Sequence, residues 1–143
     1  MKIDDLTETN VQKYIDDHRT IRTKEKDKYG EVFTPYEFIN EIMINLPNKV
    51  WSNPELCWLD PCGGTGNFML VVYVKLMKGL QKSIPDAKKR KMHILQNMLY
   101  MIELNPNNAK QLKTLFGKSA NISRSNFLDS SEKWMKDLGK SQF

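Results

Sequence analysis

Cysteine and histidine are scarce in this sequence, and their scarcity excludes several kinds of protein. The two cysteines, Cys57 and Cys62, cannot form a framework of several disulfides and fit a reducing compartment. The two histidines, His18 and His93, lie far apart and have no neighbouring thiol pair, so we expect no zinc site. The chain is therefore neither a disulfide-stabilised secreted domain nor a small zinc-binding domain.

Long apolar segments are also missing. No apolar run reaches the roughly 20 residues that a membrane-spanning helix needs, and the acidic start of the chain lacks the apolar centre of a signal peptide. These absences predict a cytoplasmic protein. The 143 residues, 40% of them hydrophobic, suffice for one domain with a real core. A net charge of +5 suits a nucleic-acid partner, although many solvated surfaces carry a similar excess.

The N-terminal part of the chain is rich in charge and poor in apolar residues. Residues 1–29 predict a charged helical arm, with a solvated helix from about Thr9 and a mixed basic and acidic stretch up to Lys28. Residues 30–143 are expected to form the folded domain, because the apolar pattern is much clearer there.

Helical and strand patterns alternate along this domain. Thr34 can cap a helix that has Pro35 in its first position and Glu37 in a capping box, so we expect a helix from there to Leu46. Further helices are expected at 68–80, 87–97, 106–116 and 131–138, and strands at 56–59, 99–102 and about 120–123. The alternation predicts an α/β fold, a Rossmann-like parallel sheet covered by helices that stops after about three strands.

A glycine-rich segment follows the first predicted strand, where open α/β sheets bind their ligands. It contains Gly63, Gly64 and Gly66, and glycine allows tight turns and close approach of the backbone to a ligand. A dinucleotide-binding loop would need glycine at the position of Met69, and a phosphate-binding P-loop would need lysine in place of Asn67. Both nucleotide-phosphate interpretations therefore fail on particular residues.

Two acidic residues follow successive predicted strands and suit a cationic ligand that has no pyrophosphate. Asp60 ends the first strand and Glu103 the second. In S-adenosylmethionine the α-amino group would pair with Asp60, loop amides would bind the carboxylate, and Glu103 would accept hydrogen bonds from the ribose hydroxyls. The alternative is that both acids only cap the following helices, where acidic residues are favoured. Two acids around a glycine turn favour the ligand.

Four segments resemble, in order and spacing, the gamma-class adenine-N6 DNA methyltransferases, which include forms fused to restriction endonucleases. These segments are Gly30-Glu31-Val32-Phe33-Thr34-Pro35, Leu59-Asp60-Pro61-Cys62-Gly63-Gly64-Thr65-Gly66-Asn67-Phe68, Met101-Ile102-Glu103-Leu104-Asn105-Pro106 and Ser125-Asn126-Phe127-Leu128. The resemblance implies that residues 30–143 are part of a domain that binds S-adenosylmethionine. The implied cofactor site contains Phe33, Thr34, Pro35, Asp60, Pro61, Gly63, Gly64, Thr65, Gly66, Asn67, Phe68, Glu103, Leu104, Asn126 and Phe127.

The resemblance also assigns roles within that site. Phe33, Thr34 and Pro35 would hold the methionine end of the cofactor, and Asn126 and Phe127 would contact its adenine base. The family usually has aspartate where Asn126 stands. An amide oxygen can still accept a hydrogen bond from the adenine amino group, so we expect weaker binding of the base but not its loss.

The catalytic motif of the family, Asn or Asp followed by Pro-Pro and Tyr or Phe, does not occur, since the sequence has no Pro-Pro pair. In the family this motif holds a flipped-out adenine. We therefore expect no catalytic residue here, and a fragment, split-gene product or decayed gene without the target-recognition domain. DNA would be contacted through the missing C-terminal part or a partner subunit. In the family the first strand pairs with the missing fourth strand, so one edge of it would be left open, which predicts self-association or a partner chain.

Other functions remain compatible with these residues. Enzymes that methylate RNA adenine or a glutamine side chain share the cofactor loop, although the segment Phe33-Thr34-Pro35 ahead of the loop favours DNA. The chain could instead be a non-catalytic cofactor-binding or protein-interaction remnant. The basic residues 88–91 could contact DNA phosphates, but a solvated helix face is favoured. No nucleophilic role is expected for Cys62, which has no neighbouring base.

Overall fold

The computed structural model describes residues 3–18, 32–129 and 133–139, and its centre is a small parallel sheet. Within the described residues, strands β1 (Trp58–Asp60), β2 (Leu99–Ile102) and β3 (Asn121–Ser123) lie in the order β1-β2-β3, so β1 and β3 are the edges. Both pairings are parallel. The parallel sheet, with helices between successive strands, confirms the predicted α/β fold class.

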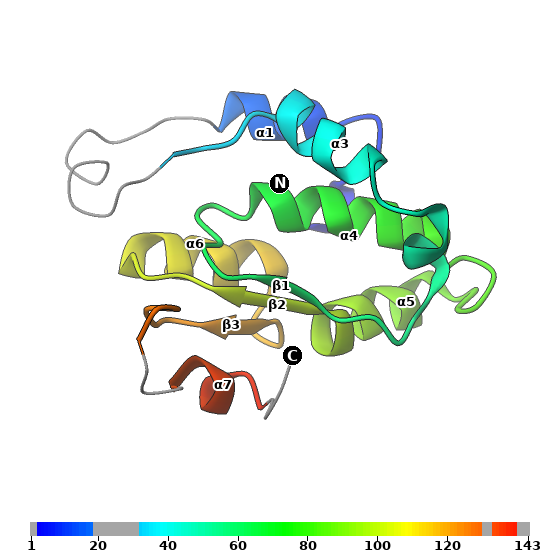
Figure 1. Ribbon diagram of the computed structural model, residues 1–143. Helices are drawn as coiled ribbons and strands as arrows, with labels where there is room; N and C mark the ends of the chain where they lie inside the picture. Colours follow the sequence, from blue (N-terminus) through cyan, green and yellow to red (C-terminus); the bar gives the residue numbers. More distant parts are fainter. Residues whose placement is uncertain (1–2, 19–31, 130–132, 140–143) are drawn as a thin grey trace.

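Helices lie on both faces of the sheet (Figure 1). α4 (Asn67–Gly79) follows β1 and covers the upper face in Figure 1, α1 (Val11–Asp17) and α3 (Tyr36–Ile44) form a further layer above α4, and α7 (Lys133–Asp137) lies below the sheet. The other helical segments are η1 Ile3–Asp5, η2 Asn48–Ser52, α5 Ala87–His93, η3 Ile94–Met98 and α6 Pro106–Phe116. Within the described residues, no helix combines the length and apolar character that crossing a membrane would require.

Alternate residues of β2 point to opposite faces of the sheet, and the two faces are covered differently. Leu99 and Met101 are fully buried in a large core that includes residues of α1, α3, α4 and α6. Tyr100 and Ile102 point to the lower face, where they form a small separate cluster with Leu138. Every residue of β2 is buried, as expected for a central parallel strand.

The start of the chain packs onto the large core. Val11 and Ile15 are buried, and α1 contacts both α3 and α4. These two residues lie four positions apart and therefore share one face of the helix. The expectation of a wholly solvated helix is thus wrong for this face. The stretch from 19 to 28 lies outside the described residues, and the boundary between arm and domain stays a prediction.

Several predicted elements have other bounds in the structure: the first helix of the domain ends at Ile44 and not at Leu46, and the bounds of α4 and β3 shift by one residue. β1 covers Trp58–Asp60 rather than 56–59, because pairing with β2 begins only at Trp58. The predicted helix 87–97 is α-helical only to His93 and then widens into the π-helical turn η3. This turn buries Ile94, Leu95 and Met98 together, which the spacing of apolar residues does not reveal. Predicted elements 99–102 and 106–116 are confirmed as β2 and α6.

The predicted capping box at the start of α3 is wrong. Pro35, not Thr34, occupies the N-cap position, and no side chain caps the helix. Glu37 instead accepts a hydrogen bond from the side-chain amide of Gln12, at 2.8 Å, because α1 lies beside α3. Caps proposed at Ser130 or Ser131 for the last helix lie outside the described residues.

Candidate functional site

The loop between β1 and α4 makes a tight turn at the C-terminal end of the sheet. Gly64 and Gly66 have φ angles of +52° and +92°, in the left-handed region that favours glycine. A Cβ atom on Gly66 would lie 2.8 Å from Cε2 of Phe116, so the end of α6 also excludes a side chain here. The N–H of Gly63 donates to the carbonyl of Ile102, at 2.8 Å. The loop is therefore held between β2 and α6.

Glu103 joins this loop to the end of β2. Its Oε2 accepts a hydrogen bond from the N–H of Gly64, and its Oε1 accepts one from the N–H of Asn105, both at 2.6 Å. Only 7% of Glu103 is exposed. Asn105 is the residue that caps α6, through the N–H of Asn107 at 2.9 Å. Glu103 therefore shapes the loop and is not the helix cap that the alternative interpretation required.

Asp60 lies at the end of β1, next to the loop. Its Oδ1 accepts a hydrogen bond from the N–H of Cys62 at 3.1 Å, and its other oxygen makes none with a described residue. Gly66 is the N-cap of α4, so Asp60 caps no helix either. Burial raises the pKa of the Asp60 carboxyl, and the hydrogen bond from Cys62 opposes this only in part. A desolvated carboxylate with a free oxygen suits a cationic ligand.

Residues 32–35 lie beside this loop although they are distant from it in sequence. The side-chain amide of Asn67 donates to the carbonyl of Thr34 at 3.2 Å, across 33 positions. The hydroxyl of Thr65 donates to the amide oxygen of Asn67 at 3.2 Å and so helps to orient it. A Cβ atom on Gly64 would lie 3.9 Å from Cε1 of Phe33. Two segments that sequence analysis assigned to one site are thus in contact.

Most N–H groups of the glycine turn are already used within the protein. Gly63 and Gly64 donate as described above, and Gly66 donates to the carbonyl of Gly63 at 2.7 Å. The N–H groups of Thr65 and Asn67 form no hydrogen bond with any described residue. They lie at the N-terminus of α4, where unpaired N–H groups and the helix dipole favour an anion. Thr65 and Asn67 are therefore the available donors for a ligand carboxylate.

Three apolar residues of the predicted site, Pro35, Pro61 and Phe68, lie in or next to the loop. Pro61 follows β1 and is half-buried. Phe68, in the first turn of α4, packs against the large core. Pro35 ends the segment beside the loop and starts α3. None of the three presents a hydrogen-bonding side chain, so their contribution to a site is packing and shape.

Cys62 lies in the same loop, close to both acids. Partial burial raises the pKa of its thiol, and the charges of Asp60 and Glu103 raise it further. The thiol is therefore protonated near neutral pH and is a poor nucleophile. Among residues 3–18, 32–129 and 133–139, no group of three or more His, Cys, Asp or Glu is placed to hold a metal ion.

The fourth predicted segment, after β3, has different surroundings. Phe127 belongs to the lower cluster, with its ring centroid 5.2 Å from that of Trp134 on α7. Asn126 accepts a hydrogen bond from the N–H of Leu128 at 3.0 Å and so closes a turn. Leu104, after β2, is 49% exposed. The apolar lower face explains the position of Phe127, and the roles of Asn126, Phe127 and Leu104 in cofactor binding stay predictions.

The basic residues 88–91 do not form one exposed face. Arg90 is 6% exposed and donates through Nη1 to the carbonyl of Ile84 at 2.7 Å. Lys91 forms an ion pair with Asp4. The expectation of a uniformly solvated basic face is therefore wrong, because this turn of α5 faces the loop after α4 and the start of the chain.

No family profile matches the chain. Over 77 residues it is 46% identical to a protein of Mycoplasma pneumoniae that bears the name uncharacterized adenine-specific methylase. This match covers 52% of the present chain but 18% of the Mycoplasma protein. The chain is thus similar to a small part of a longer methylase.

Proposed function

We propose that this chain is the S-adenosylmethionine-binding part of a methyltransferase whose complete form methylates adenine N6 in DNA. The likeness to an adenine-specific methylase supports a methyltransferase family. The observation that carries the proposal is that Asp60 and Glu103, at the ends of β1 and β2, both accept hydrogen bonds from the backbone of the glycine loop. Ligands of open α/β sheets bind at this place. In this proposal the sheet is the first part of a Rossmann-like domain.

The free groups of the loop match the two charges of the amino-acid end of the cofactor. Asp60 would accept hydrogen bonds from the α-ammonium group through the oxygen that Cys62 leaves free. The N–H groups of Thr65 and Asn67 would bind the α-carboxylate at the start of α4. Phe33 lies against this end of the loop and would cover the methionine chain. The donor set therefore fits a zwitterionic ligand.

Glu103 would bind the ribose of the cofactor. Both of its oxygens already accept a backbone N–H, but an ionised carboxylate offers about four acceptor sites. The two backbone bonds fix the carboxylate in place before a ligand binds. Leu104, Asn126 and Phe127 would then border the adenine base of the cofactor, with Leu104 offering the exposed apolar surface.

The bound cofactor would supply an electrophilic methyl group on a sulfonium centre. This chain would bind and orient the cofactor and exclude water around Asp60. Groups that activate the target amine are not among its proposed site residues. We propose that they come from a further segment or a partner chain that pairs with β1, whose outer edge has no strand beside it among the described residues.

The test is a calorimetric titration of S-adenosylmethionine into the wild-type chain and into Asp60→Asn. Asparagine keeps an oxygen that can accept from Cys62 but removes the charge. We expect binding at least about tenfold weaker, since a hydrogen bond to a charged group contributes roughly 1.5–3 kcal/mol. Glu103→Ala should weaken binding as well and loosen the loop, because Gly64 loses its acceptor.

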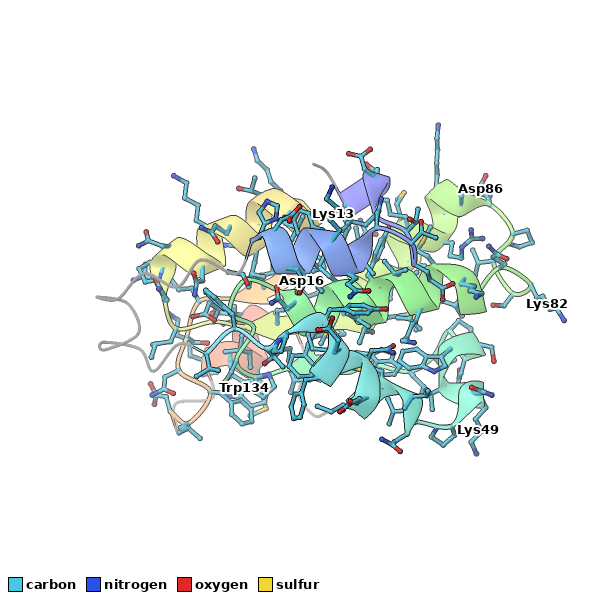
Figure 2. All side chains as sticks on the ribbon, turned by 90° about the horizontal axis from the view of Figure 1, so that it is seen from above. Lys13, Asp16, Lys49, Lys82, Asp86 and Trp134 are labelled. Atoms are coloured by element: carbon cyan, nitrogen blue, oxygen red, sulfur yellow. The ribbon has the colours of Figure 1, made fainter. Side chains whose placement is uncertain are left out.

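A matched control is Asp86→Asn. Asp86 also accepts one backbone N–H, from Lys89 at 2.8 Å, but it caps α5. Asp86 lies at one end of the molecule, and the strands point toward the other end (Figures 1 and 2). This variant should bind the cofactor like the wild type. A wild-type chain that is folded by circular dichroism but binds no S-adenosylmethionine would contradict the proposed function.

A further inference from the structure

A pocket that shares Leu104 with the proposed cofactor site lies beside the outer edge of the sheet, next to β3. It is open to solvent and has a volume of about 610 Å³. It is lined by residues of the β2–α6 loop, α6, β3, the segment after β3, and α7. These residues are Leu104, Lys113, Ile122, Arg124, Ser125, Lys133 and Asp137. Of these residues, only Leu104 is among the predicted cofactor-site residues.

The lining of this pocket is strongly basic. Lys113, Arg124 and Lys133 contribute three positive charges, and Asp137 the single negative one. Asp137 accepts a hydrogen bond from the hydroxyl of Ser123 at 2.7 Å. Among the described residues, none of the three basic side chains forms an ion pair. Three positive charges outweigh the one negative charge, which already accepts the hydrogen bond from Ser123, so the pocket favours the binding of an anion.

The kinds of side chain narrow the class of anion. Arginine presents a planar set of donors that matches phosphate oxygens, and lysine adds point charges around it. Leu104 and Ile122 supply a small apolar surface, enough for a sugar but not for a large apolar ligand. Leu104 also follows Glu103 directly, so the pocket adjoins the proposed cofactor site. A phosphate bound here would lie beside the proposed cofactor site.

We propose that this pocket binds a backbone phosphate of the nucleic acid on which the protein acts. The proposal rests on the proposed function for the identity of the substrate, but it concerns residues outside the loop that would hold the methionine end of the cofactor. On an ordinary solvated basic surface, the positive side chains would be spread over the surface and would not line a single pocket. Here the three charges come from α6, the segment after β3 and α7, and they line one pocket.

The experiment measures binding of a short fluorescently labelled DNA duplex to the full chain by anisotropy, over a range of salt concentrations. Arg124→Ala, Lys113→Ala and Lys133→Ala should each weaken binding by up to about tenfold, as expected for lost charged hydrogen bonds. Losing one phosphate contact should reduce the slope of log affinity against log salt by about 0.9. Lys82→Ala is the control, because Lys82 lies at the opposite end of the molecule from α7 and Trp134 (Figure 2).

Each outcome decides the proposal. Weaker binding in the three pocket variants, with Lys82→Ala unchanged, supports it. Equal binding in all variants, or an equal loss in Lys82→Ala, overturns it. Binding of inorganic phosphate without binding of DNA would overturn the nucleic-acid assignment. A calorimetric titration of S-adenosylmethionine into the wild-type chain and Arg124→Ala tests the two proposals separately. If both proteins bind the cofactor but the pocket variants bind DNA like the wild type, the phosphate proposal fails and the proposed function stands.

Discussion

The two faces of the sheet differ in how much of the protein covers them. On the upper face, α4 and α6 pack on the strands, and α1 and α3 pack on α4, to build the large core. On the lower face, the described chain offers only α7 and a cluster centred on Tyr100, Ile102 and Leu138. Stability therefore comes mainly from the upper face. The candidate site lies where the strands end, and its loop is held by upper-face helices.

Because the upper face holds the large core, we expect the largest loss of stability from a substitution at Leu70, a fully buried residue of α4 in that core. Leu70→Ala should lower the free energy of unfolding by about 2–5 kcal/mol, because a cavity in close-packed surroundings cannot collapse. Chemical denaturation followed by circular dichroism measures this change. An effect below that of a matched lower-face substitution would contradict the asymmetry between the faces.

Gly66→Ala should have the next largest effect. The substitution forces alanine into φ +92° and places its Cβ atom 2.8 Å from Phe116, so strain and overlap add. We expect a loss of about 2–3 kcal/mol in the free energy of unfolding. Gly117→Ala is the control in the same assay, since Gly117 has a similar φ of +93° but nothing near its added Cβ atom. It should lose less, and an equal loss would show that packing against α6 contributes nothing.

Leu138→Ala tests the lower face. Leu138 is buried against Tyr100 and Ile102, but few other elements surround it. We expect a loss of about 1–2 kcal/mol, below the range of about 2–5 kcal/mol for a leucine in a close-packed core, because α7 can adjust. The same denaturation assay applies. A loss as large as that of Leu70→Ala would mean that both faces contribute equally.

Asp60→Asn should have the smallest effect on stability, and in the opposite direction. Because burial raises the pKa of Asp60 in the folded protein, its stabilising contribution is full below the pKa of the unfolded chain. That contribution is lost as the pH rises through the folded-state pKa, so at neutral pH the ionised side chain destabilises the free protein. The variant should therefore melt slightly higher at neutral pH while losing cofactor binding. A lower melting temperature would contradict this account of Asp60.

Local sequence patterns predicted the elements that depend on local rules. The apolar run at 99–102 gives β2, and Pro106 followed by helical spacing gives α6, because both signals lie within the element itself. The prediction that Thr34 caps α3 was wrong because the surroundings of Thr34 depend on a distant segment. The carbonyl of Thr34 meets Asn67, a contact made across 33 positions, and no local pattern encodes it. The prediction that Arg90 is exposed was wrong for the same reason, because its burial depends on where the loop at Ile84 folds back.

The sequence by itself determined the α/β alternation, the glycine turn after β1 and the acids at the ends of β1 and β2, because periodicity and turn chemistry are properties of neighbouring residues. Only the tertiary structure decided that Glu103 holds Gly64 while Asp60 keeps a free oxygen. It alone gathered Lys113, Arg124 and Lys133 around one pocket. Such groupings follow from how distant segments pack, and packing depends on the whole chain at once.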